Sequence, residues 1–496
     1  MSATVETQPA VSAAGRTDPR RWLALSVVLI AAFMDLLDAG IVFLALPQIQ
    51  EDLQASYAAL QWTAAGYTLT FALVLITAGR LGDIFGRKRL FLIGVAGFTA
   101  ASVLCAAAQS PAMLIGSRVL QGAMAAVMIP QILSIIQANF VPGERATAFA
   151  AYGAAAGLAN VSGPLVAGLL IQADFFGLGW RSIFLINLPV GIATLIAAAM
   201  LVRESKAPGA LHLDPIGVAI VSVGLLLVLY PLVQGRELGW PAWSFVAMIA
   251  AIPVLAIFVL WERRKTSRDG SPLVALDLFR QRAFVAGLAV TLIVVAGISS
   301  FFLVYVLYTQ IGLGFPVLTA ALVAMPWPVG IALASAISSR YAATAGQHLL
   351  TVGSLLVALG LAALAWTIRH YGPEITGWQM MPALAVGGLG IGLVFPPLTD
   401  IALAGVPPRD AGSASGLVST AQQFGGAAGV AVIGVIFFGL LASQATTGAD
   451  PVTGAEAVRL NFSRAAAQTI WWQAGAFLVA FLLAFLLPRR GRIHQP

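Results

Sequence analysis

The stretch "GRLGDIFGRKRL", Gly79–Leu90, concentrates charged side chains between two long apolar segments. The segments 57–79 and 90–109 each contain about 20 mainly apolar residues, which is the length needed to cross the hydrocarbon core of a bilayer. Over the whole chain of 496 residues, 59% are hydrophobic and 9% are charged. Soluble domains usually carry roughly one quarter charged residues. The sequence therefore predicts an integral membrane protein in which such charged stretches form the loops.

Apolar blocks of this kind follow one another along the entire chain. Each has the length and composition of a transmembrane helix, so the predicted fold class is all-α integral membrane with 14 transmembrane helices. The blocks cover residues 22–47, 57–79, 90–109, 111–137, 146–170, 182–202, 215–235, 240–261, 283–309, 316–339, 349–368, 377–403, 412–443 and 465–488.

Basic residues are concentrated in alternate loops. Short loops rich in Lys and Arg favour the cytoplasmic side, and most basic residues fall on that side if the N-terminus lies inside. The exceptions are Arg118, within a block, and Arg181, Arg236, Arg369, Arg459 and Arg464, outside. An odd number of spans would scramble this distribution. We therefore expect a multi-pass protein of the cytoplasmic membrane with both termini in the cytoplasm.

The net charge of +7 has the same topological explanation. The basic residues are scattered over short loops rather than gathered on one folded face, so nucleic-acid binding is not expected. The chain has no phosphate-binding loop, which argues against direct ATP coupling. Its four histidines fall at loops or block ends on both sides and offer no metal set. The single cysteine, Cys105, is expected to be a small buried residue.

The chain contains an internal repeat. Adding 260 to the first four block starts, 22, 57, 90 and 111, gives numbers close to the starts of blocks nine to twelve, 283, 316, 349 and 377. Transporters are often built from such repeated halves, with the substrate site at their interface. The predicted organisation is a disordered cytoplasmic tail 1–21, a six-helix bundle 22–202, two inserted helices with a cytoplasmic linker 203–282, a second six-helix bundle 283–488 and a cytoplasmic tail 489–496.

The charged loop has a spacing that a simple topology anchor does not explain. Arg87 and Lys88 could serve only to hold the loop in the cytoplasm, but the glycines add room for close helix approach and a tight turn. The pattern Gly79-x-Leu81-Gly82-Asp83-x-x-Gly86-Arg87-Lys88 resembles the signature loop of the major facilitator superfamily. By this resemblance the loop is a conformational latch made of Gly79, Asp83, Gly86, Arg87 and Lys88, in which Asp83 holds the two halves closed and releases as they rock.

The fifth block reads "YGAAAGLANVSGPLVAGLL", residues 152–170. Small residues allow close packing of transmembrane helices, and a proline kink is tolerated there, so ordinary packing is one interpretation. Within the superfamily, the spacing of Gly157, Gly163, Pro164 and Gly168 resembles the antiporter motif that marks exporters. Ala167 departs from this motif, which usually has glycine at that position.

Two aspartates and one arginine lie inside apolar blocks. An arginine in a span costs about 2.5 to 3.5 kcal/mol on insertion scales, so Arg118 requires a partner. Arg118 lies about 10 Å from the outer end of its block, and Asp38 lies about 14 Å from Pro47, so an ion pair is expected. Asp35 lies on the same face as Asp38, and two nearby carboxylates can share a proton. A structural hydrogen bond to another helix is the alternative for Asp35.

The same residues carry a second resemblance. The pattern Arg118-x-x-Gln121-Gly122 resembles the fourth-helix motif of the superfamily, which is assigned to proton coupling. The stretch "LDAGIVFLALP", residues 37–47, resembles a motif of the fourteen-helix drug:proton antiporter family. The resemblance implies that Asp38 and Arg118 couple transport to protons, whereas Asp35 lies outside the motif and Gly40 replaces a residue that is commonly threonine. It also implies an apolar or cationic drug-like or metabolite substrate, a proton gradient as the only energy source and no cofactor.

Residues for a substrate cavity between the halves are harder to select. The candidates are Trp62, Gln121, Tyr305, Gln422 and Gln423. The aromatic residues could instead face lipid or the bundle core, and Gln422 and Gln423 could instead form interhelical hydrogen bonds. We expect a monomer whose partners are the small-molecule substrate, protons and lipid. An uptake carrier or facilitator of the same fold is the alternative function. A membrane enzyme would require a reactive constellation of side chains that the scattered histidines and lone cysteine do not supply.

Overall fold

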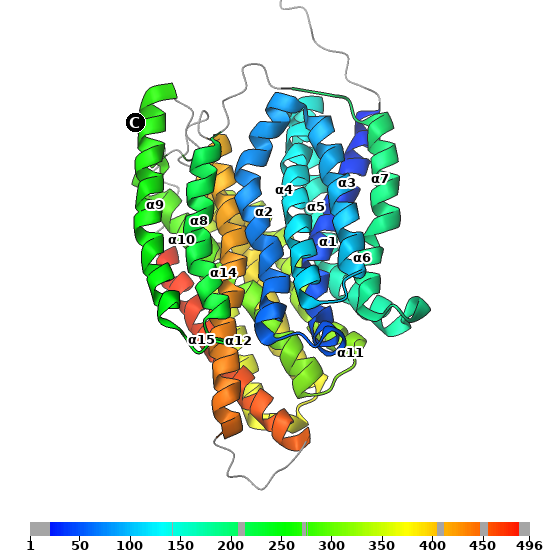
Figure 1. The fold of residues 1–496 in the computed structure, drawn as a ribbon, viewed down its shortest axis with the longest axis vertical. Coiled ribbons are helices and arrows are strands. Elements are labelled where there is room, and N and C mark those ends of the chain that lie inside the picture. Colours follow the sequence, from blue (N-terminus) through cyan, green and yellow to red (C-terminus); the bar gives the residue numbers. More distant parts are fainter. Residues whose placement is uncertain are drawn as a thin grey trace, which may run out of the picture.

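A computed structural model describes residues 20–140, 142–206, 214–269, 274, 276–403, 411–446 and 455–485. Within these residues the regular elements are helices, and fourteen of the helical segments are long and apolar enough to cross a membrane (Figure 1). The predicted all-α fold class with fourteen spans is therefore confirmed. Because the spans alternate in direction, α1 begins and α15 ends at the same end of the molecule, which we call the terminal face. The other end is the opposite face.

The first bundle contains six spans. Its helices are α1 (Arg21–Leu53), α2 (Tyr57–Phe85), α3 (Arg87–Ala106), α4 (Pro111–Asn139), α5 (Pro142–Ala173), α6 (Ser182–Leu185) and α7 (Asn187–Leu201). The prediction that the first span ends at Pro47 is wrong, since α1 continues through this proline to Leu53. A proline is tolerated inside a transmembrane helix because neighbouring groups can satisfy the freed backbone.

The rest of the chain forms an inserted pair of helices and a second bundle. These helices are α8 (Pro215–Gln234), α9 (Ala242–Asp269), α10 (Arg282–Val306), α11 (Val317–Ala324), α12 (Pro326–Tyr371), α13 (Gly377–Leu403), α14 (Ala411–Thr446) and α15 (Ala455–Ala484). A π-helical turn, η4 (Leu307–Gly312), ends α10. Figure 1 shows the inserted pair at one side of the molecule, with α8 beside α2 and α14.

The label α12 covers two helices that meet at Ala345, where φ is −124°. They belong to two separate spans, Val317–Tyr341 and Ala345–Glu374, in agreement with the predicted blocks 316–339 and 349–368. One predicted boundary in the second bundle is wrong. The last span was expected to begin at residue 465, but α15 begins at Ala455, so Arg459 and Arg464 lie in a helix. Alanine-rich and basic stretches are compatible with helix as well as with loop, which explains this error.

Two helices of the first bundle, α2 and α4, begin at a serine cap. The Ser56 hydroxyl accepts a hydrogen bond from Ala59 N at 3.2 Å at the start of α2. The Ser110 hydroxyl does the same for Met113 N at 3.3 Å at the start of α4, where Pro111 occupies the first turn. These caps satisfy backbone N–H groups that have no partner within the helix. They set the register in which α2 and α4 meet.

A glycine brings α2 and α4 together beside the buried charges. A Cβ atom added at Gly122 on α4 would collide with the carbonyl oxygen of Tyr67 on α2. Arg118 lies one turn before Gly122 on the same helix, and its guanidinium carbon lies 4.3 Å from the centre of the Tyr67 ring. The missing side chain therefore positions Tyr67 over Arg118.

We predict that Gly122→Ala destabilises the protein, whereas Gly116→Ala on the same helix does not. Overpacking against a backbone atom costs about 1 to 3 kcal/mol. A Cβ at Gly116 meets no atom within 4 Å, and a compatible Gly→Ala change in a helix stabilises by about 0.4 to 1 kcal/mol. Thermal unfolding midpoints of the purified variants in detergent test this. Equal midpoints for the two variants would contradict the packing argument.

Candidate functional site

The carboxylate of Asp38 lies at the centre of a hydrogen-bond network inside the first bundle. Its Oδ2 atom accepts a hydrogen bond from Arg118 Nη1 at 2.5 Å. Its Oδ1 atom accepts from Gln121 Nε2 at 2.9 Å and from Asn187 Nδ2 at 2.8 Å. The expected ion pair between Asp38 and Arg118 is therefore present. The three donor side chains come from α4 and α7, whereas Asp38 belongs to α1.

This ion pair is almost completely removed from solvent. The exposed fraction of the side chain is 0% for Asp38 and 1% for Arg118. Buried charges require close pairing and additional hydrogen bonds to compensate for lost hydration. Arg118 obtains them from Gln121 Oε1, at 2.6 Å from Nη1, and from the carbonyl oxygen of Thr63, at 3.3 Å from Nε. The pair is stable only while all of these partners stay in place.

Ser102 and Cys105 connect α3 to the same network. The Ser102 hydroxyl accepts hydrogen bonds from Gln121 Nε2 at 2.8 Å and from Asn187 Nδ2 at 3.2 Å. The Cys105 thiol lies 3.7 Å from Gln121 Oε1 and is buried, as expected from the sequence. The charged pair thus holds α1, α3, α4 and α7 together.

Asn187 is a site residue that the sequence reasoning missed. It is 1% exposed and begins α7, directly after Ile186, which separates α6 from α7. A polar amide inside an apolar span was the available signal, since such a group is rarely buried without a hydrogen-bond partner. The sequence alone does not show that its partner is Asp38.

Asp35 lies one helical turn from Asp38 and joins the network indirectly. It is 5% exposed, and the hydroxyl of Tyr67 donates a hydrogen bond to its Oδ1 atom. Tyr67 in turn lies against the Arg118 guanidinium. The interhelical hydrogen bond that was the alternative interpretation of Asp35 is therefore present, and it places Asp35 in the same cluster as Asp38.

The charged loop between α2 and α3 folds onto its own bundle. Gly86 adopts a φ of +115°, which favours glycine, and lets the chain turn into α3. The carboxylate of Glu204, which follows α7, accepts hydrogen bonds from the backbone N–H groups of Lys88 at 3.0 Å and Arg89 at 3.2 Å. Lys88 Nζ donates to the carbonyl oxygen of Ala199 at 2.6 Å. Glu204 is a second residue that the sequence reasoning missed.

The predicted latch is only partly visible. Arg87 Nη1 donates to the carbonyl oxygen of Ser134 on α4 at 3.4 Å, so this arginine also contacts the first bundle. Gly79 lies opposite Pro130 of α4, at 3.9 Å from an added Cβ. The side chain of Asp83 lies outside the described residues, and its predicted role stays a prediction.

The glycines of the fifth span have unequal surroundings. A Cβ added at Gly157 or Gly163 would meet no atom within 4 Å. A Cβ added at Gly168 would lie 3.0 Å from the Cα atom of Leu318 on α11. Close helix packing therefore accounts for Gly168, near the opposite face, but not for Gly157 and Gly163.

The candidate cavity residues do not gather at one place. Trp62 packs against Tyr230 of α8, with 6.0 Å between ring centroids. Gln121 belongs to the Asp38 network, and the Tyr305 hydroxyl donates to the carbonyl oxygen of Ala320 at 2.8 Å inside the second bundle. Gln422 and Gln423 are half-buried on α14.

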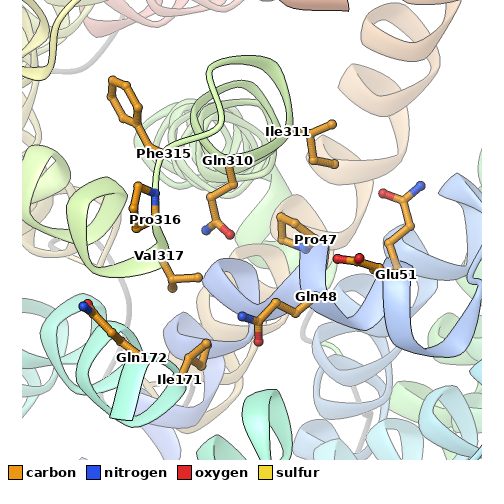
Figure 2. A pocket seen from close by; sticks show the side chains of 11 residues that line it. Pro47, Gln48, Glu51, Ile171, Gln172, Gln310, Ile311, Phe315, Pro316 and Val317 are labelled. Atoms are coloured by element: carbon orange, nitrogen blue, oxygen red, sulfur yellow. The ribbon is translucent and has the colours of Figure 1, made fainter. Parts of the chain in front are cut away.

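The two halves meet around a cavity near the opposite face. This cavity, of about 610 Å³, is open to solvent and lined by α1, α5, η4 and the start of α11 (Figure 2). Beside it, Gln310 Nε2 of η4 donates to the carbonyl oxygen of Leu44 on α1 at 3.0 Å. Gln310 therefore links the second bundle to the helix that carries Asp38.

Comparisons with known proteins agree with this architecture. The family model of the Major Facilitator Superfamily matches residues 28–430. A probable actinorhodin transporter of Streptomyces coelicolor is 47% identical over 451 residues, which cover 91% of this chain and 78% of that protein. A puromycin resistance protein of Streptomyces alboniger is 34% identical, with 95% and 92% of the two chains covered. A multidrug efflux pump of Mycolicibacterium smegmatis is 29% identical, with 94% and 92% covered.

Solved structures share the fold at low sequence identity. A bacterial homologue of the human lysosomal transporter Spinster, in an inward-facing and occupied conformation, gives a TM-score of 0.67 with 16% identity and covers 95% of this chain and 97% of its own. An auto-inhibited peptide transporter gives a TM-score of 0.66 with 18% identity, covering 96% and 98%.

We predict that Asp38→Asn lowers the stability of the protein by about 3 to 5 kcal/mol, because it leaves the Arg118 charge buried without its counterion. Adding Arg118→Met should recover part of this loss, since the double variant removes both charges. Thermal unfolding midpoints in detergent measure both effects.

The matched control is Asp52→Asn. Asp52 pairs with Arg181 at 2.7 Å, but the two side chains are 45% and 28% exposed. An exposed pair contributes about 0 to 1 kcal/mol, so this variant should stay close to the wild type. If Asp38→Asn and Asp52→Asn shifted the midpoint equally, the network would not be the structural centre of the bundle.

Proposed function

Because the chain belongs to the major facilitator superfamily and is a carrier rather than an enzyme, we propose that it exports small drug-like or metabolite molecules across the cytoplasmic membrane in exchange for protons. The relatives named for actinorhodin, puromycin and multidrug efflux support export. The two bundles, residues 22–202 and 283–488, are the proposed moving halves, with residues 203–282 inserted between them. Such halves alternate access to a site near the midplane.

The observation that carries the proton coupling is the buried ion pair. The carboxyl oxygens of Asp38 accept hydrogen bonds from Arg118, Gln121 and Asn187. A proton that reaches Asp38 removes the negative charge and leaves Arg118 buried without its counterion, an arrangement that is strongly unfavourable. The network must then rearrange. The protonated and ionised states therefore favour different packings of α1, α3, α4 and α7.

The helix α1 gives this rearrangement a route to the second bundle. Asp38 and Leu44 are six residues apart on α1, which corresponds to about 9 Å along the helix axis. The Leu44 carbonyl accepts the hydrogen bond from Gln310 of η4. A shift of α1 on protonation thus acts directly on a contact between the halves. Such coupling needs a packed element with two discrete arrangements.

The other predicted residues have supporting roles in this proposal. Asp35 modulates the proton site through Tyr67, which lies between Asp35 and Arg118. Gly157 and Gly163 leave open space beside α5 in which substrate can pass, and Pro164 lies between them and Gly168. The loop containing Asp83 closes the terminal face. Trp62, Gln422 and Gln423 are the proposed contacts for substrate.

Proton entry supplies the energy for export. A charge that crosses 100 mV of membrane potential releases about 2.3 kcal/mol. One proton per cycle can therefore drive the accumulation of an uncharged substrate by more than one order of magnitude, since 1.4 kcal/mol corresponds to about tenfold. Exchange of one proton for a monovalent cation moves no net charge and is driven by the pH difference alone. An uptake carrier or facilitator would use the same fold without this antiport, and the direction of transport separates the two.

We predict that everted membrane vesicles containing the protein accumulate ethidium or puromycin when their interior is acidified. Asp38→Asn should reduce this accumulation to the level of vesicles without the protein, because the proton site is lost. Asp52→Asn, which removes a carboxylate from α1 outside the network, should retain transport. The measurement is the fluorescence of ethidium and the uptake of radiolabelled puromycin.

Two results would count against the proposal. A resistance screen can identify an exported compound. If its uptake into everted vesicles were the same with and without a proton gradient, the proposed proton coupling would be wrong. If Asp38→Asn kept full gradient-driven uptake of that compound, the assignment of Asp38 would be wrong.

A further inference from the structure

The inserted helix pair touches both halves of the protein at once. Helix α8 packs into one apolar cluster with α2 and α14, to which Ala65, Leu229 and Ala431 contribute, and all three are buried. Helices α2 and α14 belong to different bundles. The insertion therefore covers the seam between the halves instead of extending either half alone.

At this seam, α2 of the first bundle packs closely against α14 of the second bundle. The rings of Tyr57 on α2 and Phe438 on α14 stack with 4.2 Å between centroids. One turn deeper, a Cβ atom added at Gly434 would collide with the side-chain amide of Gln61. Both contacts lie near the opposite face, because α2 begins and α14 ends there. The opposite face can open only if these surfaces separate.

The loop between α8 and α9 binds one half through Arg236. Its Nη2 atom donates a hydrogen bond of 2.5 Å to the carbonyl oxygen of Phe438 on α14. The guanidinium carbon also lies 5.7 Å from the centre of the Phe438 ring. A charge-assisted hydrogen bond is stronger than a neutral one, so this arm is a firm attachment to the second bundle.

The next residue, Glu237, binds the other half. Its Oε1 atom accepts a hydrogen bond of 2.8 Å from the backbone N–H of Ala58 in the first turn of α2. The first N–H groups of a helix have no partner within the helix, and the helix dipole favours a negative charge at this end. The carboxylate is therefore a firm attachment to the first bundle.

We propose that Arg236 and Glu237 are positioning residues for the transport cycle, which act as the two arms of a clasp that keeps the opposite face closed. This inference rests on the alternating-access function proposed above. The two residues are adjacent in sequence, so the loop between their anchors has almost no slack. Separation of α2 from α14 must release at least one arm, and the strength of the arms sets the balance between closed and open states.

The proposed clasp holds α2 and α14 together only while both Arg236 and Glu237 keep their contacts. Comparison of single and double variants tests this. Removing either arm releases the seam, so removing both should add little to removing one. Two independent stabilising contacts would instead add their effects. Arg236→Met and Glu237→Met delete the hydrogen-bonding groups while preserving side-chain length. Arg369→Met, at an exposed arginine near the end of α12 on the same face, is the matched control.

The experiment measures opening at the seam with a single reporter. Ala431→Cys places a thiol at a position that is 0% exposed, and its rate of labelling by a polar maleimide reports separation of α2 from α14. The protein is kept in lipid nanodiscs without substrate or proton gradient. The same variants without the Ala431 substitution give the background from buried Cys105.

We expect each Met variant to raise the labelling rate by about tenfold, which corresponds to about 1.4 kcal/mol in the opening equilibrium. The double variant should be labelled as fast as the single Met variants. Arg236→Lys keeps the positive charge and should be labelled more slowly than Arg236→Met, and Arg369→Met should be labelled at the wild-type rate. Unchanged labelling in both Met variants, or strictly multiplicative effects in the double variant, would overturn the clasp. Thermal unfolding midpoints exclude general unfolding as the cause of faster labelling.

Failure of the clasp and failure of the proposed function give different results. Labelling needs no transported compound, so a normal clasp response with no transport in vesicles would reject the export proposal alone. Gradient-driven transport, together with a labelling rate that the Arg236 and Glu237 substitutions do not change, would reject the clasp alone.

Discussion

The structure of the first bundle depends on the need to stabilise the Asp38 carboxylate away from water. One arginine and two amides satisfy it directly, and a serine hydroxyl aligns both amides. This demand fixes how α1, α3, α4 and α7 approach one another, because moving any of the four removes a partner from a buried charge. A site with such strict requirements has few acceptable arrangements. It can therefore switch between discrete states rather than deform gradually.

The second bundle contains a neutral counterpart of this arrangement. Gln473 of α15 donates from Nε2 to the hydroxyl of Ser300 on α10 at 3.1 Å, and both side chains are buried. These are the sixth and first helices of their bundle, as α7 and α1 are in the first bundle, where Asn187 contacts Asp38. The polar contact between the first and sixth helices thus recurs in both halves, but it carries a charge only in the first. In the proposed mechanism, protonation therefore acts on the first bundle.

The sequence predicted the fourteen spans and the pairing of Asp38 with Arg118, because length, apolarity and the cost of a lone charge in a membrane act locally. It did not predict Asn187 or Glu204, since a polar residue in a span or after it does not identify its partner. The continuation of α1 through Pro47 and the start of α15 at Ala455 were also missed. A proline is tolerated inside a membrane helix, and an alanine-rich stretch does not fix where a helix begins. The contacts between the halves depend on packing between distant segments and leave no signal in local sequence.

The central claim of this account is that Asp38 exchanges its proton against the transported compound. The most direct measurement is the number of protons released when purified protein, in weakly buffered detergent solution acidic enough to protonate Asp38, binds the compound to which it confers resistance. The account predicts proton release by the wild type and by Asp52→Asn, and none by Asp38→Asn that still binds the compound. Equal proton release by the wild type and Asp38→Asn would contradict it.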